Sequence, residues 1–101
     1  MVYINNDGRT CTLNVSTRSV APLMMHRIIR RLCSGWARAK LCRDGRVLMI
    51  NDKFDKYPLN AAATRVANQG WAVGWHTTVG GAAVLITRKE WDTWEGGFGV
   101  E

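Results

Sequence analysis

A chain of 101 residues is long enough for one domain with a single hydrophobic core. Its hydrophobic content of 47% and charged content of 22% exclude a disordered tail. The formal net charge of +6 favours an anionic partner, which is a nucleic acid, an anionic membrane surface or an acidic protein.

The N-terminal residues lack the basic start and the apolar run of a signal peptide. The longest apolar runs, residues 47–50 and 82–86, are too short to cross a bilayer. We therefore expect a soluble, cytoplasmic protein with no membrane partner. The three cysteines, Cys11, Cys33 and Cys42, have no CxxC spacing, so we expect buried free thiols and neither a disulfide framework nor a zinc site.

The first element is a predicted β-hairpin over residues 2–15, turning at an Asp-Gly dipeptide in which both residues need a positive φ. Pairing across a two-residue turn places Ile4 opposite Cys11 and Val2 opposite Leu13. One face of the hairpin is then apolar and the other polar, as in a sheet with one solvated side.

Next comes one long amphipathic helix, predicted over residues 22–40 because apolar side chains recur there with the helical period. The Ser34-Gly35 pair either kinks this helix or ends it, so one bent helix and two short helices both remain open. The apolar face carries Met25, Ile28, Ile29, Leu32, Cys33, Trp36 and Ala39, and the opposite face carries Arg27, Arg30, Arg31, Ser34 and Arg38.

The second half alternates turns with short elements. An Asp-Gly turn at residues 44–45 precedes a central strand over 46–51, which is apolar on both faces. Asn60 predicts the N-cap of a short helix that ends near Gly70. A strand over 71–77, a Gly-Gly turn at 80–81 and a strand over 82–87 predict a second hairpin. A capping box from Thr87 to Glu90 then opens a last short helix with Trp91 and Trp94.

This element order predicts an α+β fold in a single small domain spanning residues 1–101. We expect a mainly antiparallel sheet of about five strands, made of two hairpins plus a central strand. One long amphipathic helix covers the sheet, accompanied by one or two short helices. The sequence leaves the strand order and the oligomeric state open.

The strongest candidate site is the basic face formed by Arg27, Arg30, Arg31 and Arg38. Guanidinium groups are always charged and suit phosphate or carboxylate, so this face is a candidate for binding an anion or a nucleic acid. The alternative is a solvated helix face whose charge only aids solubility. Because no helix-turn-helix, zinc-finger, RRM or KH signature is present, recognition by charge or shape is favoured over the reading of a base sequence.

Five tryptophans form the second unusual feature. We expect Trp36, Trp71 and Trp75 to build the core, although Trp75 on a strand could also stack on bases together with Tyr3. Trp91 and Trp94 anchor either the domain's own core or a partner protein.

Catalysis has little support in the sequence. His76 could act as a general base only with Asp52 or Asp55 as its partner, and that set has no defined spacing. A strand-loop-helix phosphate cradle is lacking too, so we expect no catalytic residues, no metal site and no cofactor.

We therefore expect a small non-enzymatic basic binding protein whose arginine-rich face contacts a polyanion, most plausibly nucleic acid. The alternative is a protein of the phage or mobile-element type that inhibits a host protein machine, such as a nucleic-acid-guided CRISPR-type defence complex. In that case the basic helix, or Trp91 and Trp94, would dock on an acidic protein surface. This alternative rests on analogy of size and composition.

Overall fold

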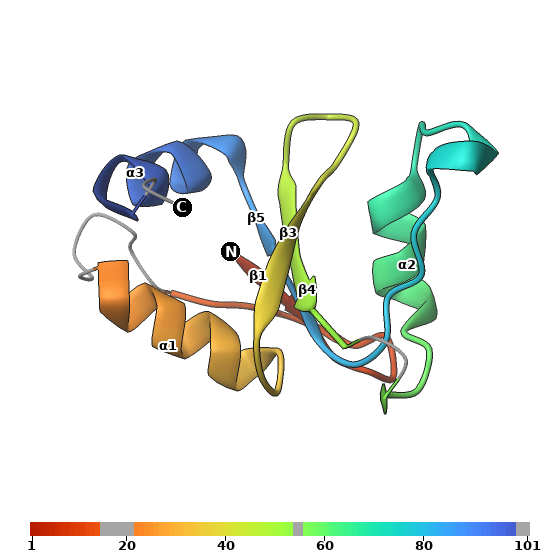
Figure 1. Cartoon of the computed structure of the whole chain (residues 1–101), viewed down its shortest axis with the longest axis horizontal. Coiled ribbons are helices and arrows are strands. Elements are labelled where there is room, and N and C mark those ends of the chain that lie inside the picture. The colour runs from red at the N-terminus through yellow and green to blue at the C-terminus, as the bar shows by residue number, and fades with distance from the viewer. Residues whose placement is uncertain (15–21, 54–55, 99–101) are drawn as a thin grey trace.

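The computed structural model describes residues 1–14, 22–53 and 56–98. It confirms an α+β fold in which an antiparallel five-stranded sheet lies between two layers of helices (Figure 1). The elements in chain order are β1 (Val2–Ile4), β2 (Thr10–Thr12), α1 (Pro22–Leu32), β3 (Ala37–Leu41), β4 (Val47–Asn51), α2 (Ala61–Asn68), the 3₁₀ helix η2 (Val73–Trp75), β5 (Ala83–Ile86) and α3 (Arg88–Phe98).

The sheet has the order β2-β1-β5-β4-β3, so β4 and β5 are interior strands and β3 is an edge. α1 and α3 cover one face, where Met25 and Trp94 pack with Val47 and Met49. α2 covers the other face, where its buried alanines, Ala63 and Ala67, pack with Leu48 and Ile50. Alternate residues of β4 thus enter opposite cores, which confirms the prediction of a central strand that is apolar on both faces.

The predicted long helix is wrong beyond Leu32, because the chain ends α1 with a left-handed cap. The Ser34 backbone N–H donates to Arg31 O at 3.3 Å, and the Gly35 N–H donates to Arg30 O at 2.8 Å. Ser34 itself has a φ of 63°. This is the Schellman arrangement, in which a residue with positive φ stops the helix. The residues that follow form strand β3, which pairs with β4.

The predicted strand over 71–77 is also wrong. These residues contain η2 and irregular backbone, and the Gly-Gly pair that follows them does not connect two paired strands. The physical reason is that β5 already has β1 on one side and β4 on the other, so no edge of β5 is left for another strand. The five-stranded count is correct, but β3 takes the place of the predicted strand.

The first hairpin forms with a register that differs from the predicted one. Ile4 lies opposite Thr10 and Tyr3 opposite Cys11, because the loop is longer than two residues. The Asn5 N–H donates to Arg9 O at 2.7 Å and closes this loop, in which Gly8 alone has a positive φ among the described loop residues. As a result β2 is exposed throughout, and the expectation of a buried thiol fails for Cys11 but holds for Cys33 and Cys42.

Both predicted helix N-caps are confirmed. Asn60 Oδ1 accepts a hydrogen bond from the Ala63 N–H at 3.0 Å. In the capping box, the Glu90 N–H donates to Thr87 Oγ1 at 3.1 Å and the Thr87 N–H donates to Glu90 Oε1 at 3.0 Å. Gly70, with a φ of 80°, lies just after α2 as expected. No helix in the described part of the chain is long and apolar enough to cross a membrane.

The capping carboxylate predicts a pH dependence of stability. Burial raises the pKa of Glu90, but hydrogen bonds from the Met1 amino group at 2.8 Å and from Thr87 outweigh it, so the net pKa lies below its ordinary value. A lowered folded-state pKa means that this stabilisation is present above the ordinary value of 4.5 and is lost as the pH falls through the folded-state pKa. We expect Glu90→Gln to cost about 1 kcal/mol at neutral pH.

Urea denaturation of the parent protein and of Glu90→Gln at several pH values measures this effect. The contribution of the other carboxylates cancels in the difference between the two proteins, because both contain them. The difference in free energy of unfolding should shrink below pH 4.5. A difference that stays constant down to pH 3 would contradict the assignment of the stabilisation to the ionised Glu90.

Candidate functional site

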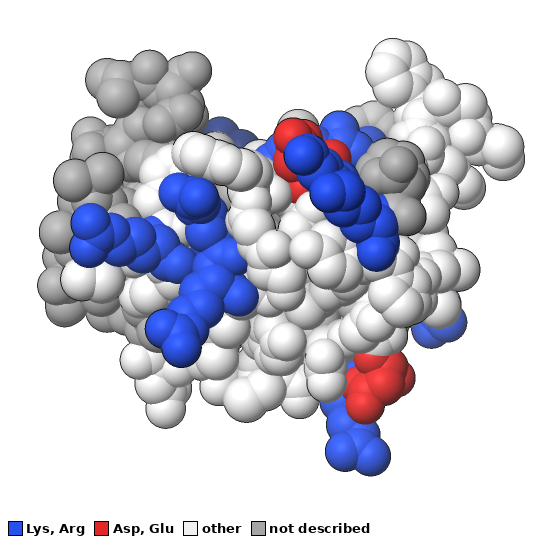
Figure 2. Space-filling model, turned by 60° about the horizontal axis from the view of Figure 1, so that its bottom comes forward, with Lys and Arg blue, Asp and Glu red and all other residues white. Residues whose placement is uncertain are grey.

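The predicted arginine face is divided between two elements. Arg27 and Arg31 are exposed on α1, and Figure 2 shows basic side chains gathered over this helix. Arg30 is half-buried because its guanidinium carbon lies 3.7 Å from the centroid of the Trp36 ring. Arg38 lies on β3 and not on the helix. Within the described residues, no carboxylate forms an ion pair with any of these four arginines.

Strand β3 places a row of side chains along one edge of the sheet. Arg38 lies opposite Ile50 and Lys40 lies opposite Leu48, so both side chains are on the face of the sheet that α2 covers. Trp36 immediately precedes the strand, two residues before Arg38, and 64% of its surface is exposed. In chain order this edge of the sheet therefore carries an aromatic ring followed by two cations.

At the far end of β3 the row meets two further tryptophans. Lys40 Nζ lies 5.3 Å from the Trp71 ring centroid and donates a hydrogen bond to Trp75 O at 3.3 Å. The guanidinium carbon of Arg43 also lies 5.3 Å from the Trp71 ring. The two indole rings are 6.5 Å apart, and Trp75 is 68% exposed. Exposure of Trp36 and Trp75 beside cations is uncommon on a small domain and makes this edge a candidate contact surface.

The segment that carries Trp71 and Trp75 is held at its base by hydrogen bonds. The Asn68 side chain donates to Thr77 O and accepts from the Thr77 N–H, both at 2.7 Å. The intervening residues leave the C-terminal end of α2 and turn through η2 (Figure 1), and the Lys40 side chain reaches them from β3. His76 Nε2 lies 2.9 Å from Trp71 O. His76 thus contacts a backbone carbonyl and not Asp52, and Asp55 lies outside the described residues.

We call this surface the aromatic–basic edge. It combines aromatic rings, from the start of β3 and the segment after α2, with cations from α1, β3 and the β3–β4 hairpin. Its members are Arg30, Trp36, Arg38, Lys40, Arg43, Trp71 and Trp75. This surface is not among the sites predicted from the sequence, because Trp36, Trp71 and Trp75 are expected there to build the core, whereas Trp36 and Trp75 are exposed and Trp71 is half-buried. The available signal was the period-two pattern of Trp36, Arg38 and Lys40 after the Ser-Gly helix stop.

The C-terminal tryptophans lie elsewhere. Trp94 is 1% exposed in the core beneath α1 and α3, with its ring 6.3 Å from His26 and 5.5 Å from Trp91. Trp91 is half-buried and packs against the same core. The sequence left open whether these tryptophans anchor the domain's own core or a partner protein. The structure places Trp94 in the domain's own core.

The two buried cysteines do not offer a reactive thiolate. Burial raises the pKa of Cys33 to about 12. Burial, followed by the nearby Asp44 carboxylate, raises the pKa of Cys42 as well. Both side chains are therefore neutral thiols near pH 7, and thiolate character is what a cysteine nucleophile requires. Within the residues described, no three His, Cys, Asp or Glu side chains are arranged to hold a metal ion.

Comparisons with protein-family models, with curated proteins and with solved structures find no match to this chain. The function therefore has to be argued from the chemistry of the aromatic–basic edge.

Proposed function

We propose that this chain is a small non-enzymatic binding protein that holds a single-stranded nucleic acid on the aromatic–basic edge. The observation that carries the proposal is the placement of exposed Trp36 and Trp75 at the two ends of a row of cations. Proteins that bind single strands combine cations, which follow the phosphates, with aromatic rings on which successive bases stack.

The geometry favours a single strand over a duplex. An exposed indole ring stacks on the face of a base, and in a duplex those faces are already stacked on neighbouring base pairs. Arg38 and Lys40 lie on a strand between the aromatic ends, so they can contact the phosphates between two stacked bases. Arg27 and Arg31 on α1 extend the positive surface next to Arg30 and Trp36. Such phosphate contacts carry no base specificity.

The alternative function, inhibition of a host protein machine, has weaker support. It relied in part on Trp91 and Trp94 as docking residues, and Trp94 is buried in the core. The basic residues alone suit an acidic protein surface as well as a phosphate backbone. Exposed tryptophans interleaved with cations are the feature that favours nucleic acid.

The test is fluorescence anisotropy with labelled oligonucleotides of about 12 nucleotides, single-stranded and duplex, at low and physiological salt. We expect the single strand to bind more tightly than the duplex. Trp36→Ala combined with Trp75→Ala should weaken single-strand binding at least about tenfold, because stacking contributes about 1–3 kcal/mol per base. A matched control is Val73→Ala, which trims an 82% exposed apolar side chain from the same segment without removing a ring.

Charge is tested separately by Arg38→Ala with Lys40→Ala, which should lower the affinity and flatten its dependence on salt. Arg9→Ala with Lys89→Ala removes the same net charge from exposed positions outside the aromatic–basic edge and should have a smaller effect. The proposal is wrong if no oligonucleotide binds at low salt, or if the tryptophan pair can be removed without loss of affinity. Binding to neither DNA nor RNA would favour a protein partner instead.

A further inference from the structure

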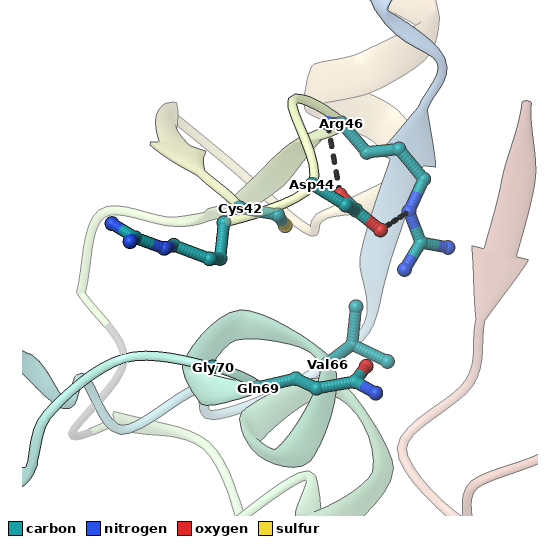
Figure 3. A pocket seen from close by; sticks show the side chains of 7 residues that line it. Cys42, Asp44, Arg46, Val66, Gln69 and Gly70 are labelled. Carbon is teal, nitrogen blue, oxygen red and sulfur yellow. Dashed lines mark hydrogen bonds and ion pairs between the residues drawn. The ribbon is translucent and has the colours of Figure 1, made fainter.

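A pocket opens directly beside the aromatic–basic edge. It lies between the tip of the β3–β4 hairpin and the end of α2, and its volume is about 310 Å³ (Figure 3). Arg43 lines the pocket and is also close to the Trp71 ring, so the pocket and the aromatic–basic edge share a residue. Gly70, which lines the pocket too, precedes Trp71 in the chain.

The polar groups around this pocket include both donors and acceptors. The Asp44 carboxylate and the Arg46 guanidinium come from the hairpin, and the Gln69 amide faces them from the end of α2 (Figure 3). Val66 and the side chain of Cys42 add apolar surface. Such a combination suits a flat polar heterocycle, which needs hydrogen bonds at its edge and apolar contact on its face.

Asp44 retains the capacity to accept further hydrogen bonds. Its Oδ1 accepts from the Arg46 backbone N–H at 3.1 Å and its Oδ2 accepts from Arg46 Nε at 2.7 Å. The backbone hydrogen bond from Arg46, with its guanidinium, keeps the pKa of Asp44 below the ordinary value, so the group is a carboxylate at neutral pH. An ionised carboxylate offers about four lone-pair positions, and these two hydrogen bonds use two of them.

A phosphate fits this pocket poorly, although Arg43 and Arg46 line it. Asp44 would repel an anion, and the pocket lies at the C-terminal end of α2, which carries the negative end of the helix dipole. A neutral nucleobase avoids both penalties. The phosphates then remain on the cations of the aromatic–basic edge.

We propose that this pocket takes one base of the bound single strand and favours a base with an exocyclic amino group. This inference rests on the proposed function and adds selectivity to it. The exocyclic amine of cytosine, adenine or guanine can donate to Asp44, and Gln69 and Arg46 suit the neighbouring ring positions. Thymine and uracil have a carbonyl oxygen where cytosine has the amine, and this oxygen would face the carboxylate.

The test compares oligo-dC with oligo-dT, because both bases are pyrimidines and cytosine carries an exocyclic amine where thymine carries a carbonyl oxygen. In the parent protein oligo-dC should bind about five- to tenfold more tightly. Val66→Phe fills the pocket, and Asp44→Asn replaces the carboxylate with an amide that can donate to the thymine carbonyl oxygen. Either variant should bring the ratio of the two affinities close to one while oligo-dT binding is retained. Ala61→Phe is the matched control, because it adds the same ring to an exposed position of α2 that does not line the pocket.

The outcomes separate this inference from the function that it refines. If both oligonucleotides bind equally to the parent, or if the ratio survives in both pocket variants, the base pocket is refuted and single-strand binding stands. If neither oligonucleotide binds to the parent, the proposed function fails and the base pocket fails with it. Asp44→Asn, at an exposed position of the hairpin, keeps the test decisive if Val66→Phe does not fold.

Discussion

Replacing Trp94 with alanine is expected to lower the free energy of unfolding by about 3–5 kcal/mol. Trp94 is 1% exposed and packs in the core with Met25 and Ile29 of α1. Among the α3 side chains that the structure describes, Trp94 is buried and the neighbouring Trp91 is half-buried. Removing the indole would leave a large cavity and take away the main attachment of α3 to the sheet.

Urea denaturation followed by circular dichroism measures this loss, and the melting temperature should fall by about 4–8 °C for each kcal/mol. Trp75→Ala is the control, because it removes the same side chain from a site that is 68% exposed. That variant should change stability by less than about 0.5 kcal/mol. If Trp94→Ala costs no more than Trp75→Ala, the packing of α3 on the core is wrong.

The same two variants separate stability from function. Trp75 belongs to the aromatic–basic edge and Trp94 to the core, so we expect Trp75→Ala to lose nucleic-acid affinity without losing stability. Trp94→Ala should lose stability, and any affinity that it retains should match the fraction of molecules still folded. Two tryptophans of equal hydrophobicity are thus expected to respond differently to the same substitution, because the fold exposes one and buries the other.

Local signals in the sequence predicted well. The caps at Asn60 and Thr87 were found because each depends on hydrogen bonds between residues three apart. The central strand β4 was found because a run of apolar residues on both faces requires cover on both sides. Both inferences use information contained within a few neighbouring residues.

The predicted helix includes residues 36–40 because Trp36 and Ala39 also fit the helical period that begins at Met25. Residues 36–41 also alternate in sequence between Trp36, Arg38 and Lys40 and three smaller apolar residues, which is the period of a strand. The cap at Ser34 decides between the two, and a serine with positive φ is not evident from the sequence. This one error moved Arg38 onto the wrong element.

The candidate site was missed for a different reason. Hydrophobicity alone places tryptophans in the core, and here the face of the sheet under α2 is filled by smaller residues, including Ala63, Ala67 and Val79. The alanines let α2 pack close to the sheet, and Trp36 and Trp75 are exposed instead. The aromatic–basic edge brings together residues from 30 to 75, so it exists only once the strand order is known.

Asn60→Ala is expected to cost about 3–5 kcal/mol, because one fully buried side chain holds three segments together. Its Nδ2 donates to Gly81 O at 2.9 Å, to Asn5 O at 3.1 Å and to Ile4 O at 3.3 Å. Its Oδ1 caps α2. Alanine would leave buried backbone groups without partners between the end of β1, the start of α2 and the turn before β5.

Asn60→Asp tests this explanation by keeping the shape and the cap acceptor while changing the donor. Three carbonyl oxygens would then surround a buried carboxylate, so its folded-state pKa should rise above the ordinary value. A raised pKa for an acid means that the penalty is largest at neutral pH and shrinks as the pH falls through the folded-state pKa toward the ordinary value of about 4, because the protonated group can donate again. Asn14→Ala, at an exposed position, is the control and should be nearly neutral. If the stability of Asn60→Asp relative to Asn60→Ala does not rise on acidification, donation from Nδ2 is not what holds these segments together.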